Sequence, residues 1–376
     1  MKIARIESHP VRHRLSEPYG ACRGLTPVRS GLIVRVHTDE GLTGIGEAWG
    51  TPELLAPHVE YLAHSFLGQD PFDSEVLWTR VVGSNYFRGN KGALITALSG
   101  IDIALWDLMG KATGLPACKL LGGAARTKLL AYASTGYIRQ NPFDLETLRR
   151  EAEEAVAQGF RAIKIKIGVG CKGDVARVEL VRRLAGETML VMVDANACYT
   201  AAEAIQVGRA LQPYQVHWFE EPVPPEDLEG YGQVTRALDM SVAGGEVEFT
   251  RFNYREVITR HLLDIVQVDV CRCGGLGEAR TIARMAQAFN LPVVPHAWTS
   301  GVGVAATLQF AASLPTYPYG FHEPVPPLFE YDRAENPLRE ELLQERFRLQ
   351  DGWIEVPMGP GLGVTLDEER LKAFGD

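Results

Sequence analysis

Short apolar runs alternate with amphipathic stretches over the larger, second part of the chain, beginning near Lys128. The apolar runs span residues 162–167, 190–193, 216–219, 240–243, 265–268 and 292–294. Stretches with helical periodicity, such as residues 144–158 and 277–289, lie between them. Strands that alternate with helices form parallel sheets. Because strands this apolar are usually covered on both faces, the pattern predicts a closed barrel.

The first part of the chain has a different pattern. Residues 2–7 and 30–38 read as strands, and an acidic-glycine turn at 39–41 before residues 42–48 predicts an antiparallel hairpin. Residues 52–110 read as helices, in which Ser99 and Asp102 fit an N-cap arrangement. Strands followed by helices indicate an α+β unit. With 376 residues, we expect an α+β domain at 1–125, a barrel at 126–330 and a C-terminal segment at 331–376 that packs back on the first domain.

A titratable side chain stands near the carboxyl end of each apolar run. The series is Lys164 and Lys166, Asp194, Glu220, Glu246, Asp269 and His296, with successive members of the ladder 23 to 28 residues apart. That interval suits one strand, one helix and two loops of a βα-barrel, whose carboxyl-end rim carries the active site. A single charged residue at the end of a strand has a purely structural explanation. Seven in phase instead predict a site where the side chains converge.

Three consecutive members of this series, Asp194, Glu220 and Glu246, are carboxylates. They would repel one another strongly at one rim unless a cation lies among them. Oxygen ligands without cysteine or histidine favour Mg²⁺, completed by water and substrate oxygens. The sequence therefore predicts a magnesium site.

Candidate proton-transfer groups stand on both sides of these carboxylates in the chain. Strand alternation points Lys164 and Lys166 into the barrel, where burial, the neighbouring ammonium and a metal would lower the pKa of one lysine. Asp269 precedes His296 by one strand and helix unit. A carboxylate bonded to one ring nitrogen would fix the tautomer of His296 and raise the basicity of the other nitrogen.

Composition excludes some classes of function. The net charge is −9 with a pI of about 5.6, which argues against nucleic acid and anionic membrane as partners. The six cysteines are scattered, without a CxxC motif, and we expect free thiols. Neither a signal peptide nor a long apolar span is evident, so a cytoplasmic enzyme is expected.

The sequence resembles the enolase superfamily, in particular its mandelate racemase subgroup. The similar motifs are Lys164-Ile165-Lys166, Val193-Asp194-Ala195-Asn196, Trp218-Phe219-Glu220-Glu221-Pro222, Gly245-Glu246, Gln267-Val268-Asp269 and Pro295-His296. They agree with the family in order, residue type and spacing, and the likeness runs almost end to end. The resemblance implies an α/β fold, a modified (β/α)7β TIM-like barrel with an α+β N-terminal capping domain. Enolase-superfamily sites with lysine or histidine bases and Mg²⁺ are a known general pattern.

The resemblance also implies roles for individual residues. Asp194, Glu220 and Glu246 match metal ligands, Lys166 matches one base with Lys164 beside it, and the Asp269–His296 dyad matches the other. Glu323 matches the acid that hydrogen-bonds the substrate carboxylate, although Glu330 is a second candidate. Asn196 is expected to touch substrate.

Within the subgroup, the pattern is most similar to acid-sugar dehydratases and galactarolactone cycloisomerases. Residues 295–298, which end at Trp298, and residues 329–337 carry this likeness. The loop that begins at Tyr19 contains Arg23 and Arg29, which either bind a second carboxylate of the substrate or are solvated charges.

The expected substrate is a small hydroxy or sugar acid, or its lactone. The base would remove the α-proton, and Mg²⁺ with a protonated Glu323 would stabilise the enediolate as it forms. Loss of a C3 oxygen then completes a β-elimination, which we favour. Return of a proton to C2 by a racemase or epimerase is the alternative. A non-catalytic ligand-binding barrel is a remote alternative, because no metal ligand or base of the pattern is missing. We also expect a homo-oligomer.

Overall fold

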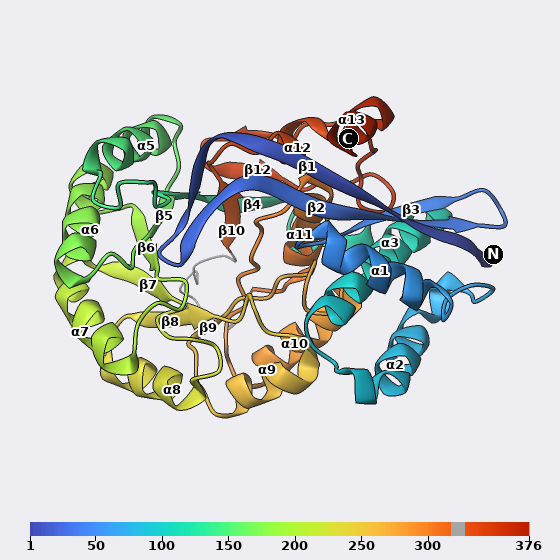
Figure 1. Ribbon diagram of the computed structural model, residues 1–376, viewed down its shortest axis with the longest axis horizontal. Helices are drawn as coiled ribbons and strands as arrows, with labels where there is room; N and C mark the ends of the chain where they lie inside the picture. The colour runs from blue at the N-terminus through green and yellow to red at the C-terminus, as the bar shows by residue number, and fades with distance from the viewer. Residues whose placement is uncertain (317–327, 376) are drawn as a thin grey trace.

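The computed structural model describes residues 1–316 and 328–375 as a barrel with a smaller unit on one side (Figure 1). The smaller unit contains β1 (Ile3–Ala21), β2 (Gly24–Thr38), β3 (Thr43–Ala48), α1 (Pro52–Ala63), η1 (Pro71–Asp73), α2 (Ser74–Ser84), η2 (Tyr86–Arg88), α3 (Ala93–Thr113) and α4 (Ala117–Leu120). Its three strands form one antiparallel sheet in the order β1-β2-β3. This unit is the expected capping domain.

The barrel alternates strands with helices. Its elements are β4 (Lys128–Thr135), α5 (Leu145–Ala157), β5 (Ala162–Lys166), α6 (Cys171–Ala185), β6 (Leu190–Asp194), α7 (Ala201–Leu211), η3 (Gln212–Tyr214), β7 (Val216–Glu220), α8 (Leu228–Ala237), β8 (Ser241–Gly244), α9 (Thr250–Thr259), β9 (Ile265–Val266), α10 (Leu276–Ala288), α11 (Gly301–Ser313) and β10 (Leu328–Asp332). Strands β4 to β9 pair in parallel in chain order, Val293 bridges to Val266 of β9, and β10 pairs in parallel with β4. The helices surround this ring (Figure 1).

Strand alternation explains the burial on both sides of the barrel wall. In β5, Ile163 and Ile165 face the helices in a large apolar cluster, whereas Ala162 joins Trp218 and Met192 in the cluster that fills the barrel. Lys164 therefore points inward, as do alternate residues of any strand in such a barrel. The interior is a packed apolar core into which a few polar side chains, such as Lys164, also project.

The capping domain packs tightly because two glycines of β3 let the long helix α3 approach. A Cβ atom at Gly44 would lie 2.0 Å from the carbonyl oxygen of Ala104, and one at Gly46 would lie 2.1 Å from that of Gly100. Helix α3 is long and apolar enough to cross a membrane, but 94% of its most apolar window is buried in the protein, as in a core helix. Beside Gly46, Glu47 accepts hydrogen bonds from the backbone of the first turn of α11, which joins the two domains.

The hairpin of β1 and β2 extends from the capping domain across the barrel (Figure 1). Its register shifts between the pairs Arg14–Val28 and Tyr19–Thr26, so that β1 carries several extra residues there. Beyond this bulge, the backbone of Gly20 exchanges two hydrogen bonds of 2.9 Å with Ile138 of the barrel. The hairpin tip thus rests on the barrel rim.

The C-terminal segment contacts both domains. It contains α12 (Pro337–Glu341), β11 (Leu349–Gln350), β12 (Trp353–Glu355) and α13 (Glu368–Gly375). Strand β12 pairs antiparallel with β4 of the barrel, whereas Glu368 of α13 forms an ion pair with Arg35 of β2. The segment therefore bridges the domains as well as packing back on the first.

Three local predictions need correction. Ser99 is not an N-cap, because it lies within α3, where its hydroxyl donates to the carbonyl oxygen of Ile95. Strand β1 continues to Ala21 and β2 begins at Gly24, so the first hairpin is far longer than residues 2–7 and 30–38 suggested. Strands β4 and β10, which pair with each other to close the barrel, were not among the apolar runs identified in the sequence.

Candidate active site

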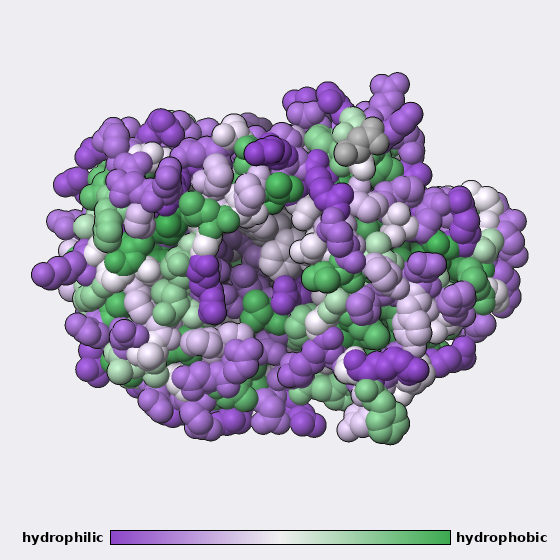
Figure 2. Space-filling model, viewed as in Figure 1, coloured by the Kyte–Doolittle hydropathy of each residue, from purple (hydrophilic) through white to green (hydrophobic). Residues whose placement is uncertain are grey.

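The rim of the barrel collects the predicted polar ladder in strand order. Lys164 and Lys166 lie in β5, Asp194 ends β6, Glu220 ends β7, Glu246 follows β8, Asp269 follows β9, and His296 follows the bridge at Val293. Figure 2 shows this face hollowed near its centre, over the barrel interior. The residues that were spaced along the sequence therefore share one mouth.

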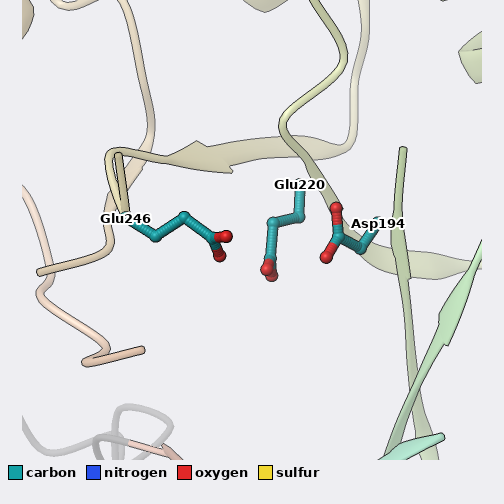
Figure 3. Close-up of side chains that lie close together, drawn as sticks. All are labelled: Asp194, Glu220 and Glu246. Atoms are coloured by element: carbon teal, nitrogen blue, oxygen red, sulfur yellow. The ribbon is translucent and has the colours of Figure 1, made fainter. Parts of the chain in front are cut away.

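The carboxylates of Asp194, Glu220 and Glu246 form a compact cluster. Ligand oxygens of the three residues lie within 4.8 Å of one another. In Figure 3 the carboxylate of Glu220 lies between the other two, which point toward it. Burial raises the pKa of Glu220 to about 8; the ammonium of Lys164 opposes this, and the two neighbouring carboxylates add to it. Such crowding of buried acids is costly without a cation.

The cluster fits a divalent cation. Its donors are all hard carboxylate oxygens, the type that Mg²⁺ prefers. Oε2 of Glu246 is buried and makes no hydrogen bond within residues 1–316 and 328–375, which leaves it available as a ligand. Glu220 is held in place by hydrogen bonds from Trp218 (3.0 Å) and Gln267 (2.7 Å). Outer partners of this kind orient ligands in metal sites.

Two lysines stand on one side of the cluster. Nζ of Lys166 lies 2.5 Å from Oδ2 of Asp194, and Nζ of Lys164 lies 2.5 Å from Oε1 of Glu220. Burial lowers the pKa of each lysine, but the surrounding carboxylates outweigh it and both values are raised. The sequence predicts instead that one lysine has a lowered pKa when a metal is bound. A metal bound by these carboxylates would compete with the lysines for the same negative charge.

The dyad of Asp269 and His296 stands on the other side. Nδ1 of His296 lies 2.6 Å from Oδ2 of Asp269, and Nε2 lies 3.4 Å from Glu246. Burial lowers the pKa of His296, but the carboxylates of Glu246, Glu330 and Asp269 raise it to about 10. The hydrogen bond at Nδ1 leaves Nε2 facing the carboxylate cluster of Asp194, Glu220 and Glu246.

Glu330, in the middle of β10, joins the two sides. Its carboxylate lies 2.9 Å from Nζ of Lys164 and 3.8 Å from Nε2 of His296. Burial raises its pKa, but Lys164 and His296 outweigh that effect and lower it. Glu323, the other glutamate considered from the sequence, lies outside the described residues. Of these two candidates, Glu330 is the one whose position the structure describes, and it lies at the site.

The underside of the capping hairpin meets a polar network at the mouth. Arg29 is buried in an ion pair with Asp332, and its guanidinium stacks 3.6 Å from the ring centre of Trp298. Nη1 of Arg29 is buried without a hydrogen-bond partner in the described chain. The hydroxyl of Tyr137 donates to Asp332 and accepts from the indole nitrogen of Trp298, both at 2.9 Å. Tyr137, which follows the overlooked strand β4, was missed by the sequence analysis.

The other residues predicted to contact substrate, Tyr19, Asn196 and Arg23, differ in how deeply they are buried. The ring of Tyr19 is buried 4.9 Å from that of Tyr137, and its hydroxyl donates to the backbone of Glu335. Asn196 donates its backbone N–H to Asp194 (2.8 Å), and its Oδ1 is buried without a partner among the described residues. Arg23 lies at the exposed hairpin tip, where it donates to the carbonyl oxygen of Ala197 (3.0 Å). Arg23 is thus farther from the mouth's buried network than Arg29.

Trp49 is a second residue that sequence reasoning missed. It follows β3, and its ring centre lies 5.4 Å from that of His296 and 6.2 Å from that of Trp298. The sequence signal that could have identified Trp49 was a large aromatic residue in the loop directly after the predicted hairpin. It adds an apolar wall on the histidine side of the mouth.

Comparison with known proteins agrees with this architecture. The family model described as enolase C-terminal domain-like matches residues 147–370, and that of the mandelate racemase / muconate lactonizing enzyme N-terminal domain matches residues 6–122. The chain is 37% identical to D-galactarolactone cycloisomerase of Agrobacterium fabrum, over 100% of this chain and 99% of that protein. It is 34% identical to arabinonate dehydratase of Saccharolobus solfataricus, over 91% and 90%.

Solved structures of relatives have the same fold. The crystal structure of 3,6-anhydro-D-galactonate cycloisomerase from Zobellia galactanivorans matches with a TM-score of 0.90 and 33% identity, covering 100% of this chain and 99% of that chain. A racemase from Streptomyces coelicolor with bound magnesium matches with a TM-score of 0.88 and 30% identity, covering 99% and 98%. The barrel, the cap and the acidic cluster together confirm the expected fold and family. The chain belongs to the enolase superfamily and, within it, to the mandelate racemase and muconate lactonizing enzyme subgroup.

Proposed function

We propose that the protein is a Mg²⁺-dependent enzyme that removes the α-proton of an acid sugar or its lactone and then eliminates the oxygen substituent at C3. The arrangement of the rim is the observation that carries the proposal. The three carboxylates of the proposed metal site stand at the ends of consecutive strands, β6, β7 and β8. Lys166 lies on β5, the strand before them, and His296 comes after them in the chain. A substrate carboxylate at the cluster would then have a proton-transfer group on each face of C2.

Different side chains of the site would carry out proton transfer and charge stabilisation. Lys166 or His296 takes the α-proton, according to the configuration at C2, and the group on the other side gives a proton to the departing oxygen. Asp269 holds the imidazole through Nδ1, so that Nε2 exchanges the proton (2.6 Å). Lys164, between Glu220 and Glu330, adds positive charge where the substrate carboxylate becomes more negative. Bound Mg²⁺ would supply further stabilisation of that charge.

Glu330 is our choice over Glu323 for the group beside the substrate carboxylate. Its contacts with Lys164 and His296 support this assignment. Its lowered pKa means that it is ionised before substrate binds. A second carboxylate beside it would raise that pKa, because like charges disfavour ionisation, and would favour uptake of a proton.

The relatives support acid sugars as the substrate class, since they include a D-galactarolactone cycloisomerase and dehydratases of arabinonate and D-galactonate. Between the two arginines of the hairpin, we assign Arg29 to the far end of the substrate. The unpaired Nη1 supports this choice, whereas the tip position of Arg23 does not.

The direct test is a screen of aldonates, aldarates and their lactones with and without Mg²⁺. Each reaction is followed by a carbonyl-specific assay for a 2-keto-3-deoxy product and by NMR. Dehydration releases water from an open-chain acid, whereas lactone opening gives an isomer of the same mass. Conversion of one such compound, lost in EDTA and restored by Mg²⁺, is the expected result. Inversion at C2 without a keto product would replace elimination by racemisation.

A further inference from the structure

The tip of the capping hairpin places a cysteine against the rim of the barrel. Cys22 lies in the turn between β1 and β2, and its thiol donates to the carbonyl oxygen of Ala195, one residue beyond β6, at 3.1 Å. Cys198 stands three residues farther along the same loop. Cys22 and Cys198 are both only partly buried. The two thiols therefore belong to the cap and to the barrel, respectively, and reagents can reach them.

The two sulfur atoms meet beside Gly168, in the loop after β5. A Cβ atom at Gly168 would lie 2.7 Å from Sγ of Cys198 and 3.1 Å from Sγ of Cys22. Both sulfurs thus approach one point on the glycine backbone. Gly168 has φ +105°, a conformation that other residues rarely adopt, so the space for the thiol pair is built into the loop.

The two thiols differ in reactivity. The neighbouring thiol of Cys198 lowers the pKa of Cys22; burial and Asp194 oppose this, and Arg23 adds to it. The closeness of Cys22, together with burial, raises the pKa of Cys198. A thiolate is the reactive form of cysteine. Cys22 is therefore the attacking sulfur and Cys198 the resolving one.

We propose that Cys22 and Cys198 form a dithiol modification site whose oxidation to a disulfide fastens the hairpin tip over the barrel mouth. The oxidant is a low-molecular-weight disulfide of the glutathione class. The Cys22 thiolate attacks one of its sulfurs, the oxidant's S–S bond breaks and one thiolate leaves. Cys198 loses its proton to solvent and attacks the Cys22 sulfur, which expels the second thiolate. The protein gives up two electrons and two protons, and the oxidant becomes two thiols.

The consequence for the hairpin follows from its existing contacts. In the reduced protein the tip is held by hydrogen bonds such as that from Arg23 to Ala197 and those between Gly20 and Ile138. Each of these is a non-covalent contact that breaks and re-forms without chemical change. A covalent bond at Cys22 removes that freedom, because the tip can then leave the rim only if the disulfide is reduced.

The test uses the full-length, Mg²⁺-loaded protein treated with oxidised glutathione, followed by alkylation of the remaining thiols and peptide mass mapping. The expected product is a Cys22–Cys198 cross-linked peptide pair that is two hydrogens lighter than the reduced pair. Cys198→Ser should instead accumulate glutathione on Cys22, and Cys22→Ser should leave Cys198 unreacted. Cys171→Ser, at the start of the neighbouring helix α6, is the matched control and should cross-link as the parent does.

Hydrogen exchange measures the effect on the hairpin. Amides of residues 19–26 should exchange about tenfold or more slowly after oxidation, and dithiothreitol should reverse the change. Phenylarsine oxide, which binds two close thiols, provides a measurement on the unmutated chain and should block both cysteines at one arsenic per chain. A cross-link that forms only in urea, or one that forms without slower exchange of the tip, would overturn the proposal.

Discussion

Arg29→Met removes the positive half of a buried ion pair at the barrel mouth. The side chains of Arg29 and Asp332 are 3% and 2% exposed. After the substitution, Asp332 would keep the hydrogen bonds from Tyr137 and from the backbone of Ala334, both 2.9 Å, and the nearby charge of Arg339, but would lose the guanidinium that pairs with its carboxylate. Breaking a buried ion pair in this way is strongly unfavourable.

The magnitude follows from these contacts. Removing one partner of a buried pair costs about 3–5 kcal/mol, and the two remaining donors to Asp332 favour the lower end, about 3 kcal/mol. A chain of 376 residues has an unfolding entropy of about 0.8 kcal/mol/K. The expected decrease in Tm is therefore about 4 °C.

Calorimetric Tm values of four proteins separate the interaction energy of the Arg29–Asp332 pair from the separate effects of the two side chains. The parent, Arg29→Met, Asp332→Asn and the double variant form a cycle in which the double variant should recover most of the loss, to within about 1 kcal/mol of the parent. Additive losses, or a Tm for Arg29→Met within 1 °C of the parent, would refute the reasoning. On a converted diacid, Arg29→Met should also lower kcat/KM about tenfold, the value of one charged hydrogen bond, with a smaller effect on a monoacid of equal length.

Three further variants test the site and the fold. Glu220→Gln should abolish turnover and weaken Mg²⁺ binding at least about 100-fold by calorimetry, because one of three anionic ligands is lost. His296→Asn should block elimination while Lys166 still exchanges the substrate α-proton with D2O, or the converse for the opposite C2 configuration, as read by NMR. Burial raises the pKa of Asp102 to about 7. The unfolded chain therefore loses this proton at lower pH than the folded protein does, and the free energy of unfolding falls as pH rises from about 4 to about 7. Asp102→Asn, which can still accept from Gly277 at 3.0 Å in the parent, should therefore gain about 2–3 kcal/mol on the parent between pH 5 and pH 8.

Each of these expectations has an outcome that contradicts it. Normal Mg²⁺ affinity in Glu220→Gln would remove the carboxylate from the metal site. Loss of both exchange and elimination in each single variant of His296 and Lys166, with fold and metal intact, would argue against two independent faces. A Tm difference between Asp102→Asn and the parent that stays constant with pH would show that the carboxyl group is not titrating in this range.

The local pattern of apolar runs followed by a charged residue was enough to predict the strand ends that form the barrel rim. The run at 190–193 followed by Asp194 predicted β6 and its carboxylate within one residue, because a buried strand leaves both a hydrophobic and a polar signature. The same held for Glu220. The long β1–β2 hairpin lacked that signature: it crosses the barrel as a ribbon with many exposed side chains, including prolines such as Pro18. Its position depends on contacts that the local sequence does not encode, such as Arg29 with Asp332, 303 residues apart.

The register shift divides the hairpin into a root that is fixed to the body of the protein and a tip beyond the bulge that is held by fewer contacts. Its root is fixed, since Glu335 accepts hydrogen bonds from Ser16 within the bulge, and Glu47 of β3 binds the first turn of α11. Beyond the bulge, residues 19–26 make five hydrogen bonds to the barrel side within the described residues, through Tyr19, Gly20, Cys22 and Arg23. If each bond contributes a net value of about 1 kcal/mol, the five together favour the docked tip by about 5 kcal/mol. With these bonds alone, the tip would be detached from the barrel in roughly one molecule in a few thousand. For a substrate that reaches the site only past the detached tip, that population would set the apparent association rate about three to four orders of magnitude below the encounter rate. Weakening a single tip contact would raise the association rate about fivefold without altering any group that handles the proton.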